Sequence, residues 1–323
     1  MSRALLRPGD TLRVVAPSRS WSTIENTPVE LESAAMAIRR LESLGLTVTF
    51  GDAIEEQDLW GAASVDRRIA DLHAAFADPD VHGIITVIGG WNANQILDGL
   101  DWDLIRANPK PVCGYSDITA LHGALWAKTG MPSLYGPHIS TFGMRDGIEY
   151  TLQGLRTALF EPAFTLEPSA HWSDDAWFLD QDDRVHRPNP GWTVVNPGTA
   201  EGIALGGHLT TLHLLQGTPY MPDLDGAVLF VEDTRGIQDF DRVLQSILHS
   251  GVRPAALLVG RSPLRAPLDP DELRRVVALR PQLRAIPVVA GLDVGHTTPH
   301  ATIPIGAPAR VSASGSVVTI AFG

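Results

Sequence analysis

Four short apolar runs, each followed by a helical pattern, occupy the first half of this 323-residue chain. The runs are "TLRVVAP", "LTVTF", "GIITVIGG" and "PVCGYS", and their length and bounding turn residues are typical of buried strands. The helical pattern is clearest over residues 29–44, where Gly45 supplies the stop. Strands that alternate with helices pair in parallel, because each helix returns the chain to the same end of the sheet. The pattern therefore predicts an α/β fold whose parallel sheet is covered on both faces.

The composition changes near residue 161, where the chain loses its periodicity and gains proline, aspartate and tryptophan. A connection of this length without regular structure is uncommon in a compact protein and usually carries function. A different alternation of strands and helices resumes near residue 193. Because the length also favours two domains, we predict an N-terminal α/β domain over 1–165, a linker and substrate loop over 166–192, and a C-terminal mixed α/β domain over 193–323.

Charge and termini restrict the partners of the chain. The formal net charge is −12 and there is no run of lysine or arginine, which argues against nucleic acid as a partner. The N-terminal apolar run is too short and too interrupted for a signal peptide or a membrane span, so we expect a cytoplasmic protein with no membrane partner. The single cysteine, Cys113, agrees with a reducing compartment, and its apolar neighbours favour a buried, unreactive thiol.

Ser116 lies where the run "PVCGYS" meets the helical pattern "DITALHGALWAK". One interpretation is a helix cap, since serine and aspartate are frequent at helix N-termini. The other is a nucleophile on a tight strand-to-helix turn, with the N–H group of Asp117 stabilising the oxyanion. Gly114 and Ser116 match the first half of a G-x-S-x-G elbow, but Ile118 stands where the second glycine belongs. The motif alone leaves both interpretations open, and a serine nucleophile also requires a base.

A base and an orienting acid are available later in the chain. His296 follows an apolar strand, in the glycine- and proline-rich stretch "GLDVGHTTPHATIPIG". The buried run "GAVLFVED" ends on Glu232 and Asp233, and a carboxylate at a strand end is well placed to orient a loop histidine. The alternative role for these carboxylates is to cap the following helix, which suits Asp233 better than Glu232. The order serine, acid, histidine matches one known order of catalytic triads.

Two further patterns concern cofactors. Gly89 and Gly90 follow a predicted strand directly, where glycines let backbone N–H groups face a ligand. The pair lacks the G-x-G-x-x-G spacing of a dinucleotide-binding turn, so no nicotinamide cofactor is expected. The spacing of His208 and His213, and that of His296 and His300, does not fit a zinc-ligand pair on one helical face. We therefore predict no metal and no other cofactor.

With these residues in place, the chain resembles the LD-carboxypeptidase family of serine peptidases, which also contains the microcin C self-immunity proteins. The matching stretches run from residue 9 to about residue 306, and they are "GDTLRVVAPSRS", "VIGGWNANQILDGLDWDLIRANPKPVCGYSDITALHGALWAKTG", "LYGPH", "GGHLTTLHLLQGTPYMPD", "LFVED" and "GHTTPHATIPIG". The resemblance implies a flavodoxin-like N-terminal domain that carries the nucleophile and a C-terminal domain that supplies Glu and His. It also implies a homodimer.

The resemblance assigns roles position by position. It implies that Ser116 in "GYSD" is the nucleophile, that Glu232 in "VED" is the triad acid and that His296 in "GH" is the general base. It further implies that the backbone N–H groups of Gly90 and Asp117 form the oxyanion hole. The implied reaction is amide hydrolysis through an acyl-enzyme, without a cofactor.

The family offers two substrate classes. LD-carboxypeptidases proper remove the terminal D-alanine from a cytoplasmic murein tetrapeptide, whereas immunity-type members cut the amide between a peptide and a modified nucleotide. Segment 168–192, with Trp172, Trp177 and Trp192, is similar to the longer, Trp-containing loop of the immunity-type branch, so we favour a peptidyl-nucleotide substrate. A tryptophan there can stack on a nucleobase, and the alternative is that these side chains only pack the loop onto the body of the protein.

We predict substrate contacts at Gly89, Trp91, Trp177 and Trp192. A hypothesis from a different class is a non-catalytic module that uses the cleft between its domains to bind a muropeptide or a nucleotide. The presence of all three triad residue types favours the enzyme.

Overall fold

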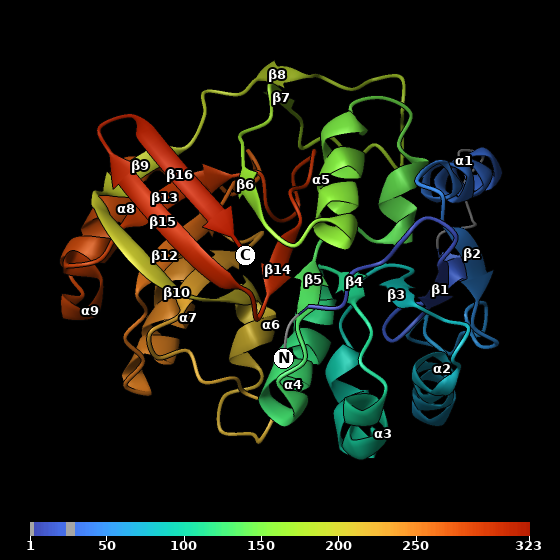
Figure 1. The fold of residues 1–323 in the computed structure, drawn as a ribbon. Helices are drawn as coiled ribbons and strands as arrows, with labels where there is room; N and C mark the ends of the chain where they lie inside the picture. Colours follow the sequence, from blue (N-terminus) through green and yellow to red (C-terminus); the bar gives the residue numbers. More distant parts are fainter. Residues whose placement is uncertain (1–2, 24–29) are drawn as a thin grey trace.

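The computed structural model describes residues 3–23 and 30–323, and its two large sheets lie side by side (Figure 1). The first sheet has the strand order β14-β5-β4-β3-β1-β2. Its strands β1 to β5 all pair in parallel, which confirms the predicted flavodoxin-like topology. The strands of this sheet are β1 (Thr11–Val15), β2 (Thr47–Phe50), β3 (Gly83–Thr86), β4 (Val112–Gly114), β5 (Ser133–Tyr135) and β14 (Ile303–Ile305).

Helices cover both faces of this first sheet. One face packs against α1, α5 and η4, and the other against α2, α3 and α4 (Figure 1). The helix predicted over 29–44 is α1, although residue 29 lies outside the described residues. None of the helices in the described part of the chain is both long enough and apolar enough to span a bilayer. The helical elements here are η1 (Trp21–Thr23), α1 (Glu30–Ser43), α2 (Val65–Ala77), η2 (Ala93–Gly99), α3 (Trp102–Ala107), η3 (Ser116–Ile118), α4 (Thr119–Thr129), η4 (Ile139–Gly143) and α5 (Glu149–Phe160).

The second sheet is mixed, with the order β6-β16-β15-β10-β11-β12-β13-β9. Strands β10 to β13 are parallel, and antiparallel strands flank them on both sides. Its strands are β6 (Phe164–Leu166), β9 (Thr193–Asn196), β10 (Gly198–His208), β11 (Val228–Glu232), β12 (Ala256–Gly260), β13 (Val288–Leu292), β15 (Pro308–Ser314) and β16 (Val317–Phe322). Its helices are α6 (Leu209–His213), α7 (Ile237–His249), α8 (Pro270–Ala278) and α9 (Pro281–Arg284).

Each sheet takes an edge strand from beyond the predicted division of the chain. Strand β6 crosses the predicted bound at residue 165 and pairs with β16 of the second sheet. Strand β14 belongs to the C-terminal part of the sequence, yet it closes the edge of the first sheet against β5. Both strands are only three residues long, and such short edge strands carry no signal that says which sheet they join. Domain bounds at 165 and 193 therefore remain a prediction.

The segment 166–192 is more ordered than its composition suggests. Strands β7 (His171–Trp172) and β8 (Arg187–Pro188) pair as a small antiparallel ribbon. In Figure 1 this ribbon lies above the gap between the two sheets. Backbone hydrogen bonds join Ser173 to Thr298 in both directions, at 2.8 and 2.7 Å. The segment is thus fastened to the loop that follows β13.

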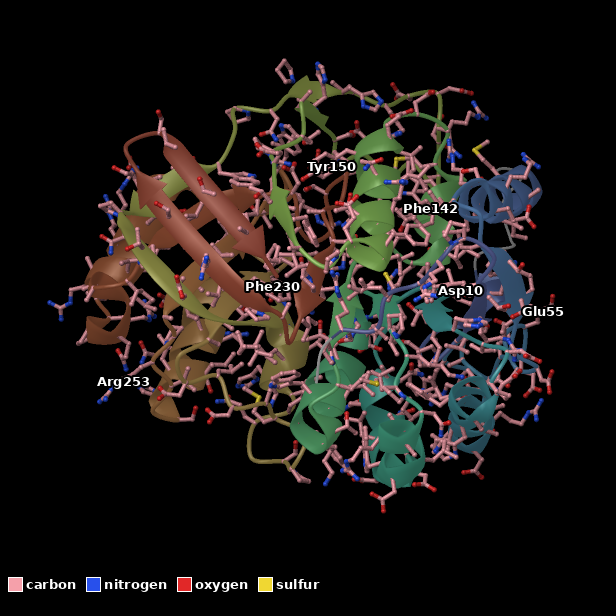
Figure 2. The ribbon with its side chains drawn as sticks, viewed as in Figure 1. Asp10, Glu55, Phe142, Tyr150, Phe230 and Arg253 are labelled. Carbon is pink, nitrogen blue, oxygen red and sulfur yellow. The ribbon has the colours of Figure 1, made fainter. Side chains whose placement is uncertain are left out.

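The apolar cores do not follow the two sheets. The larger core contains Phe230 and joins the second sheet to α2, α3 and α4, whereas the smaller core contains Phe142 and lies under α1 and α5 (Figure 2). Burial of apolar side chains across the boundary resists relative motion of the two sheets, because separating them would expose this surface to water.

Gly207 permits a close approach between the two halves. Gly207 lies at the end of β10, and a Cβ atom there would lie 2.6 Å from Oγ1 of Thr119 and 3.1 Å from the ring of Tyr135. The backbone at Gly207 has a φ of +140°, which side chains rarely adopt. Glycine is therefore required both for the conformation and for the space between β10 and α4.

We expect Gly207→Ala to lower the free energy of unfolding by about 2 to 4 kcal/mol, because it combines overpacking with backbone strain. Chemical denaturation of the full chain measures this difference. Gly236→Ala is the matched control, since a Cβ atom at Gly236 meets no heavy atom within 4 Å. Equal losses of stability in the two variants would contradict this account of the contact between the sheets.

Candidate active site

The predicted site residues lie at the carboxyl ends of parallel strands in both sheets. Ser116 follows β4 and Gly90 follows β3 in the first sheet. In the second sheet, Glu232 ends β11 and His296 follows β13. Ligand sites of open α/β sheets form at this edge, because the loops that leave it converge there. Here the two edges face each other, so residues from both sheets meet.

Ser116 occupies the sharp turn between β4 and α4. Its φ of +60° makes it the only non-glycine residue with a positive φ in residues 3–23 and 30–323. A serine in this region costs of order 1 to 3 kcal/mol of strain and persists only where the surroundings impose it. No side-chain capping bond is present at η3 or at α4, so the helix-cap interpretation of Ser116 is wrong.

Neighbouring groups hold this turn in place. The Thr119 hydroxyl donates to the Ser116 carbonyl at 2.6 Å and accepts from the His208 N–H at 2.9 Å. The Ser116 N–H donates to the Tyr135 hydroxyl at 3.2 Å. A Cβ atom on Gly114 would lie 2.3 Å from Oγ1 of Thr86, so only glycine allows β4 to enter the turn this close to β3.

Ser116, His296 and Glu232 form a continuous hydrogen-bonded chain. Nε2 of His296 lies 3.0 Å from Oγ of Ser116, although the two residues are 180 positions apart. Nδ1 of His296 lies 2.9 Å from Oε2 of Glu232. These distances are within hydrogen-bonding range for nucleophile to base and for base to acid. The geometry allows His296 to accept the serine proton while Glu232 orients the imidazole.

The charges of Glu232 and His296 stabilise this arrangement. Glu232 is buried, which by itself would raise its pKa, but attraction and hydrogen bonding from His296, with help from His208 and Tyr135, hold its pKa at about 2. Burial opposes the charged form of His296, and the Glu232 carboxylate more than offsets this and raises the pKa of His296 above its ordinary value. Glu232 is therefore ionised at neutral pH and strengthens its neighbour as a base.

The glycine pair after β3 lies directly against the serine. A Cβ atom on Gly89 would lie 3.0 Å from Cβ and 3.2 Å from Oγ of Ser116, and one on Gly90 would lie 2.3 Å from Oγ of Ser18. The N–H groups of Gly90 and Asp117 donate to no acceptor among residues 3–23 and 30–323. Backbone donors left open beside a nucleophile can receive an oxyanion.

The Asp117 side chain has a structural task. Its Oδ2 atom accepts from the Ser18 hydroxyl at 2.6 Å and from the Ala93 N–H at 2.8 Å, and the residue is buried. Asp117 thereby ties the loop that contains Gly90 to the turn that contains Ser116. Asp233 likewise does not cap α7, since it accepts from the Thr210 hydroxyl and from the Arg235 N–H.

A pocket of about 700 Å³ opens beside His296. Segment 166–192 supplies one wall of it, with Trp177 and Phe178 as its aromatic surface. Arg187 and Arg265 provide positive charge, and Asp174 with its neighbour Asp175 provides negative charge. The pocket thus combines aromatic surface with charges of both signs.

Buried polar contacts fasten this wall to the His296 loop. The Ser169 hydroxyl donates to Asp293 at 2.6 Å, and the Arg261 guanidinium pairs with the same carboxylate at 2.7 Å. Trp172 lies against the Arg261 guanidinium at 5.1 Å from the ring centre. Asp293 is three positions before His296, so these contacts also restrict the loop that holds the histidine.

The structure brings one of the three tryptophans predicted to contact substrate to the pocket. Trp177 lines it. Trp192 packs instead against the larger apolar core, and Trp91 is 75% exposed beneath the Arg19 guanidinium, outside the pocket wall. The sequence shows that a segment is rich in tryptophan, but the direction of each ring depends on how the segment packs.

His208, His213 and His300 each contact residues outside the proposed triad. Nδ1 of His208 lies 2.8 Å from the Thr211 hydroxyl, and Nε2 of His213 lies 3.0 Å from the Ser246 hydroxyl. His300 is buried against the Tyr115 ring. Across the described residues, His, Cys, Asp and Glu side chains form no group of three that could hold a metal ion.

Cys113 agrees with the expectation from the sequence, whereas Tyr135 has a contact that the sequence did not suggest. Cys113 is buried, as expected, and burial raises the pKa of its thiol. Tyr135 had no predicted role, although it lies in the quoted stretch "LYGPH". Its hydroxyl donates to Oε1 of Glu232 at 2.7 Å. The only signal in the sequence is a tyrosine at the end of a short apolar run, which is typical of ordinary core residues as well.

Comparison with known proteins supports the resemblance over nearly the whole chain. The model of the LD-carboxypeptidase N-terminal domain matches residues 12–136, and that of the LD-carboxypeptidase C-terminal domain matches residues 201–311. A Treponema pallidum protein that carries a carboxypeptidase name is 44% identical over 99% of this chain and 95% of its own length. A Bacillus subtilis protein that carries the name of a murein peptide carboxypeptidase is 31% identical over 98% of this chain and 93% of its own length.

The microcin branch is also represented. The microcin C7 self-immunity protein MccF of Escherichia coli is 30% identical over 82% of this chain and 81% of its own length. The crystal structure of an MccF-like protein from Bacillus anthracis has a TM-score of 0.94 at 39% identity, over 100% of this chain and 99% of that chain. A structure of MccF in complex with glutamyl sulfamoyl guanosine has a TM-score of 0.88 at 26% identity, over 99% and 98% of the two chains.

Both domain models and full-length relatives agree with the two-domain α/β fold, and the chain belongs to the LD-carboxypeptidase family.

Proposed function

We propose that this protein is a serine peptidase in which Ser116 is the nucleophile, His296 the general base and Glu232 the acid that orients the base. The single observation that supports this most strongly is the unbroken hydrogen-bonded chain from Oγ of Ser116 through His296 to Glu232, at 3.0 and 2.9 Å. The strained turn at Ser116 is a second support, because strain of this kind clusters at functional sites.

In the proposed reaction, Nε2 of His296 accepts the proton of Ser116 while Oγ attacks the carbonyl carbon of the substrate amide. The N–H groups of Gly90 and Asp117 stabilise the oxyanion of the tetrahedral intermediate. The imidazolium returns the proton to the leaving nitrogen, the C–N bond breaks, and the acyl-enzyme remains. Water then gives a proton to His296 and attacks the ester carbonyl. The bond between the carbonyl carbon and Oγ breaks, the imidazolium returns the proton to Oγ, and the acid leaves.

For the substrate, we favour an amide near the C-terminus of a peptide that is joined to a nucleotide. MccF, which shares this fold, has been solved with glutamyl sulfamoyl guanosine and with aspartyl sulfamoyl adenosine. In this chain, Trp177 and Phe178 line the same pocket as His296, the proposed general base, and they offer an aromatic wall on which a nucleobase can stack. Gly89, which lies against Ser116, remains a predicted contact, whereas Trp91 and Trp192 do not line this pocket.

The second candidate is a murein tetrapeptide LD-carboxypeptidase that releases D-alanine. A relative with a murein peptide carboxypeptidase name, similar over nearly the full length, favours it. The two arginines of the pocket, Arg187 and Arg265, suit the free carboxylate of a peptide C-terminus. A homodimer and a cytoplasmic location complete the proposal, and both follow from the family resemblance and the sequence.

Product analysis separates these functions. We expect Ser116→Ala to lower turnover by about ten-thousand-fold or more, as in other serine triads. Mass spectrometry follows the products of wild type and variant with a murein tetrapeptide and, separately, with a peptidyl-nucleotide. The control is Ser250→Ala, at the C-terminal end of α7, whose hydroxyl donates to the Ile247 carbonyl at 2.6 Å.

Release of D-alanine assigns the murein branch, and release of the free nucleotide part assigns the immunity branch. If wild type cleaves neither substrate and a fluorophosphonate probe does not label Ser116, the proposed function is wrong. If Ser116→Ala retains every measured effect of the wild type, the non-catalytic binding module replaces it.

The pH profile of kcat/KM tests the acid–base pair. Only neutral His296 can accept a proton, so activity falls as the pH drops through the pKa of His296, which Glu232 raises above about 6.5. Glu232→Gln removes that negative charge. We expect the acid limb of the variant to move to lower pH while its rate falls. An acid limb that does not move would contradict the assignment of Glu232.

Trp177→Ala tests the choice of substrate. Stacking on a nucleobase is worth about 1 to 3 kcal/mol, so we expect KM for a peptidyl-nucleotide to rise about 5- to 150-fold. The KM for a murein tetrapeptide should change little, because that substrate has no base. Trp102→Ala is the matched control, since Trp102 lies on α3 and does not line the pocket. Equal KM changes for both substrates would count against nucleobase stacking.

A further inference from the structure

Tyr135 connects two members of the proposed triad without belonging to it. The Tyr135 hydroxyl accepts from the Ser116 N–H at 3.2 Å and donates to Oε1 of Glu232 at 2.7 Å. Glu232 uses its other oxygen for His296, so the two carboxylate oxygens have one partner each in these two side chains. The tyrosine therefore closes a ring of contacts that runs through Ser116, His296 and Glu232.

The Tyr135 ring is closely packed on all sides that the described residues show. The residue ends β5, is buried, and packs against the Phe230 ring at 5.3 Å and the Tyr115 ring at 6.4 Å. Gly207 leaves just enough room for it, since a Cβ atom there would lie 3.1 Å from Cε2 of the tyrosine. A hydroxyl that is fixed this firmly acts as a preorganised donor.

The direction of hydrogen bonding follows from the groups involved. The Ser116 N–H can only donate, and the ionised Glu232 can only accept, so the tyrosine must accept from the first and donate to the second. Burial and the nearby carboxylate raise the pKa of Tyr135, so the hydroxyl keeps its proton at all working pH values. Hydrogen bonds that run in one direction polarise one another.

We propose that Tyr135 is a positioning residue that acts on both ends of the triad. It holds the Ser116 turn in its strained conformation. Its hydrogen bond also stabilises the negative charge of Glu232, so that the carboxylate attracts the protonated His296 ring less strongly. This inference rests on the proposed function. It adds Tyr135 as a fourth residue to the three of the proposed triad, and it links this residue of the first sheet to the acid of the second.

The proton affinity of His296 depends on the Tyr135 hydroxyl under this proposal. When the tyrosine hydroxyl is absent, Glu232 has lost one donor and binds the imidazolium more strongly. The affinity of His296 for a proton then rises. The other titratable or polar groups around His296, which the substitution does not change, are Asp233, His208, Tyr115, His138, His300, Arg265 and Ser116.

The test is Tyr135→Phe in the full chain, with labelling of Ser116 by a fluorophosphonate probe followed as a function of pH. We expect labelling to slow by about 10- to 100-fold, the value of a hydrogen bond to a charged group. We also expect the acid limb of the labelling rate to move to higher pH. An NMR titration of the His296 ring in the same variant should show its pKa shifted upward.

Tyr220→Phe is the matched control, because Tyr220 also donates its hydroxyl to a carboxylate, Asp98 at 2.5 Å, without contact to the triad. It should leave both the labelling rate and the titration of His296 unchanged. If Tyr135→Phe does not fold, 3-fluorotyrosine at position 135 keeps the ring and strengthens the donor. The pKa of His296 should then move downward instead.

The role of Tyr135 is overturned if the His296 pKa does not move in either variant, or if the labelling rate of a folded Tyr135→Phe equals that of the wild type. Failure of the proposed function has a different signature, because the wild type itself would then not be labelled at Ser116. The titration of His296 still decides the role of Tyr135 in that case, since it requires no turnover.

Discussion

The site depends on a buried negative charge. Glu232 ends a central strand where water cannot reach it, and a carboxylate in such a place is costly unless donors surround it. The two side chains that hydrogen-bond to it come from different sheets, since His296 belongs to a loop of the second sheet and Tyr135 ends a strand of the first. The need to satisfy this charge therefore joins the two halves of the protein at the same point where the proposed chemistry takes place.

The rest of the architecture keeps these groups in register. A continuous apolar core crosses from the second sheet to α4, and Gly207 allows β10 to lie against Thr119. Thr119 in turn holds the Ser116 carbonyl. On the far side, Ser173 and Asp293 tie segment 166–192 to the loop of His296, so the pocket wall and the proposed base belong to one connected unit.

Much of this could be predicted from the sequence. The alternation of strands and helices predicted the parallel sheet, because hydrophobic periodicity reports local structure directly. The family resemblance pointed to Ser116, Glu232 and His296, and in the structure the His296 ring hydrogen-bonds to both of the other two side chains. The exchange of β6 and β14 between the sheets was not predictable, since strand pairing depends on partners far away in the sequence. For the same reason, nothing local distinguished Trp177, which lines the pocket, from Trp192, which packs on the core.

The sequence by itself determined the secondary structure of the N-terminal half, the family, and the residue types that can perform acyl transfer. These are properties of short stretches, in which propensity, spacing and residue chemistry are local. Only the tertiary structure decided that the Ser116 turn adopts φ of +60°, that the open N–H groups of Gly90 and Asp117 flank the elbow, and that Tyr135 bridges two proposed triad members. Those features arise from close packing between segments that are distant in the sequence, as Ser116 and His296 are at 180 positions apart. The packing that stabilises them forms only when the two sheets come together.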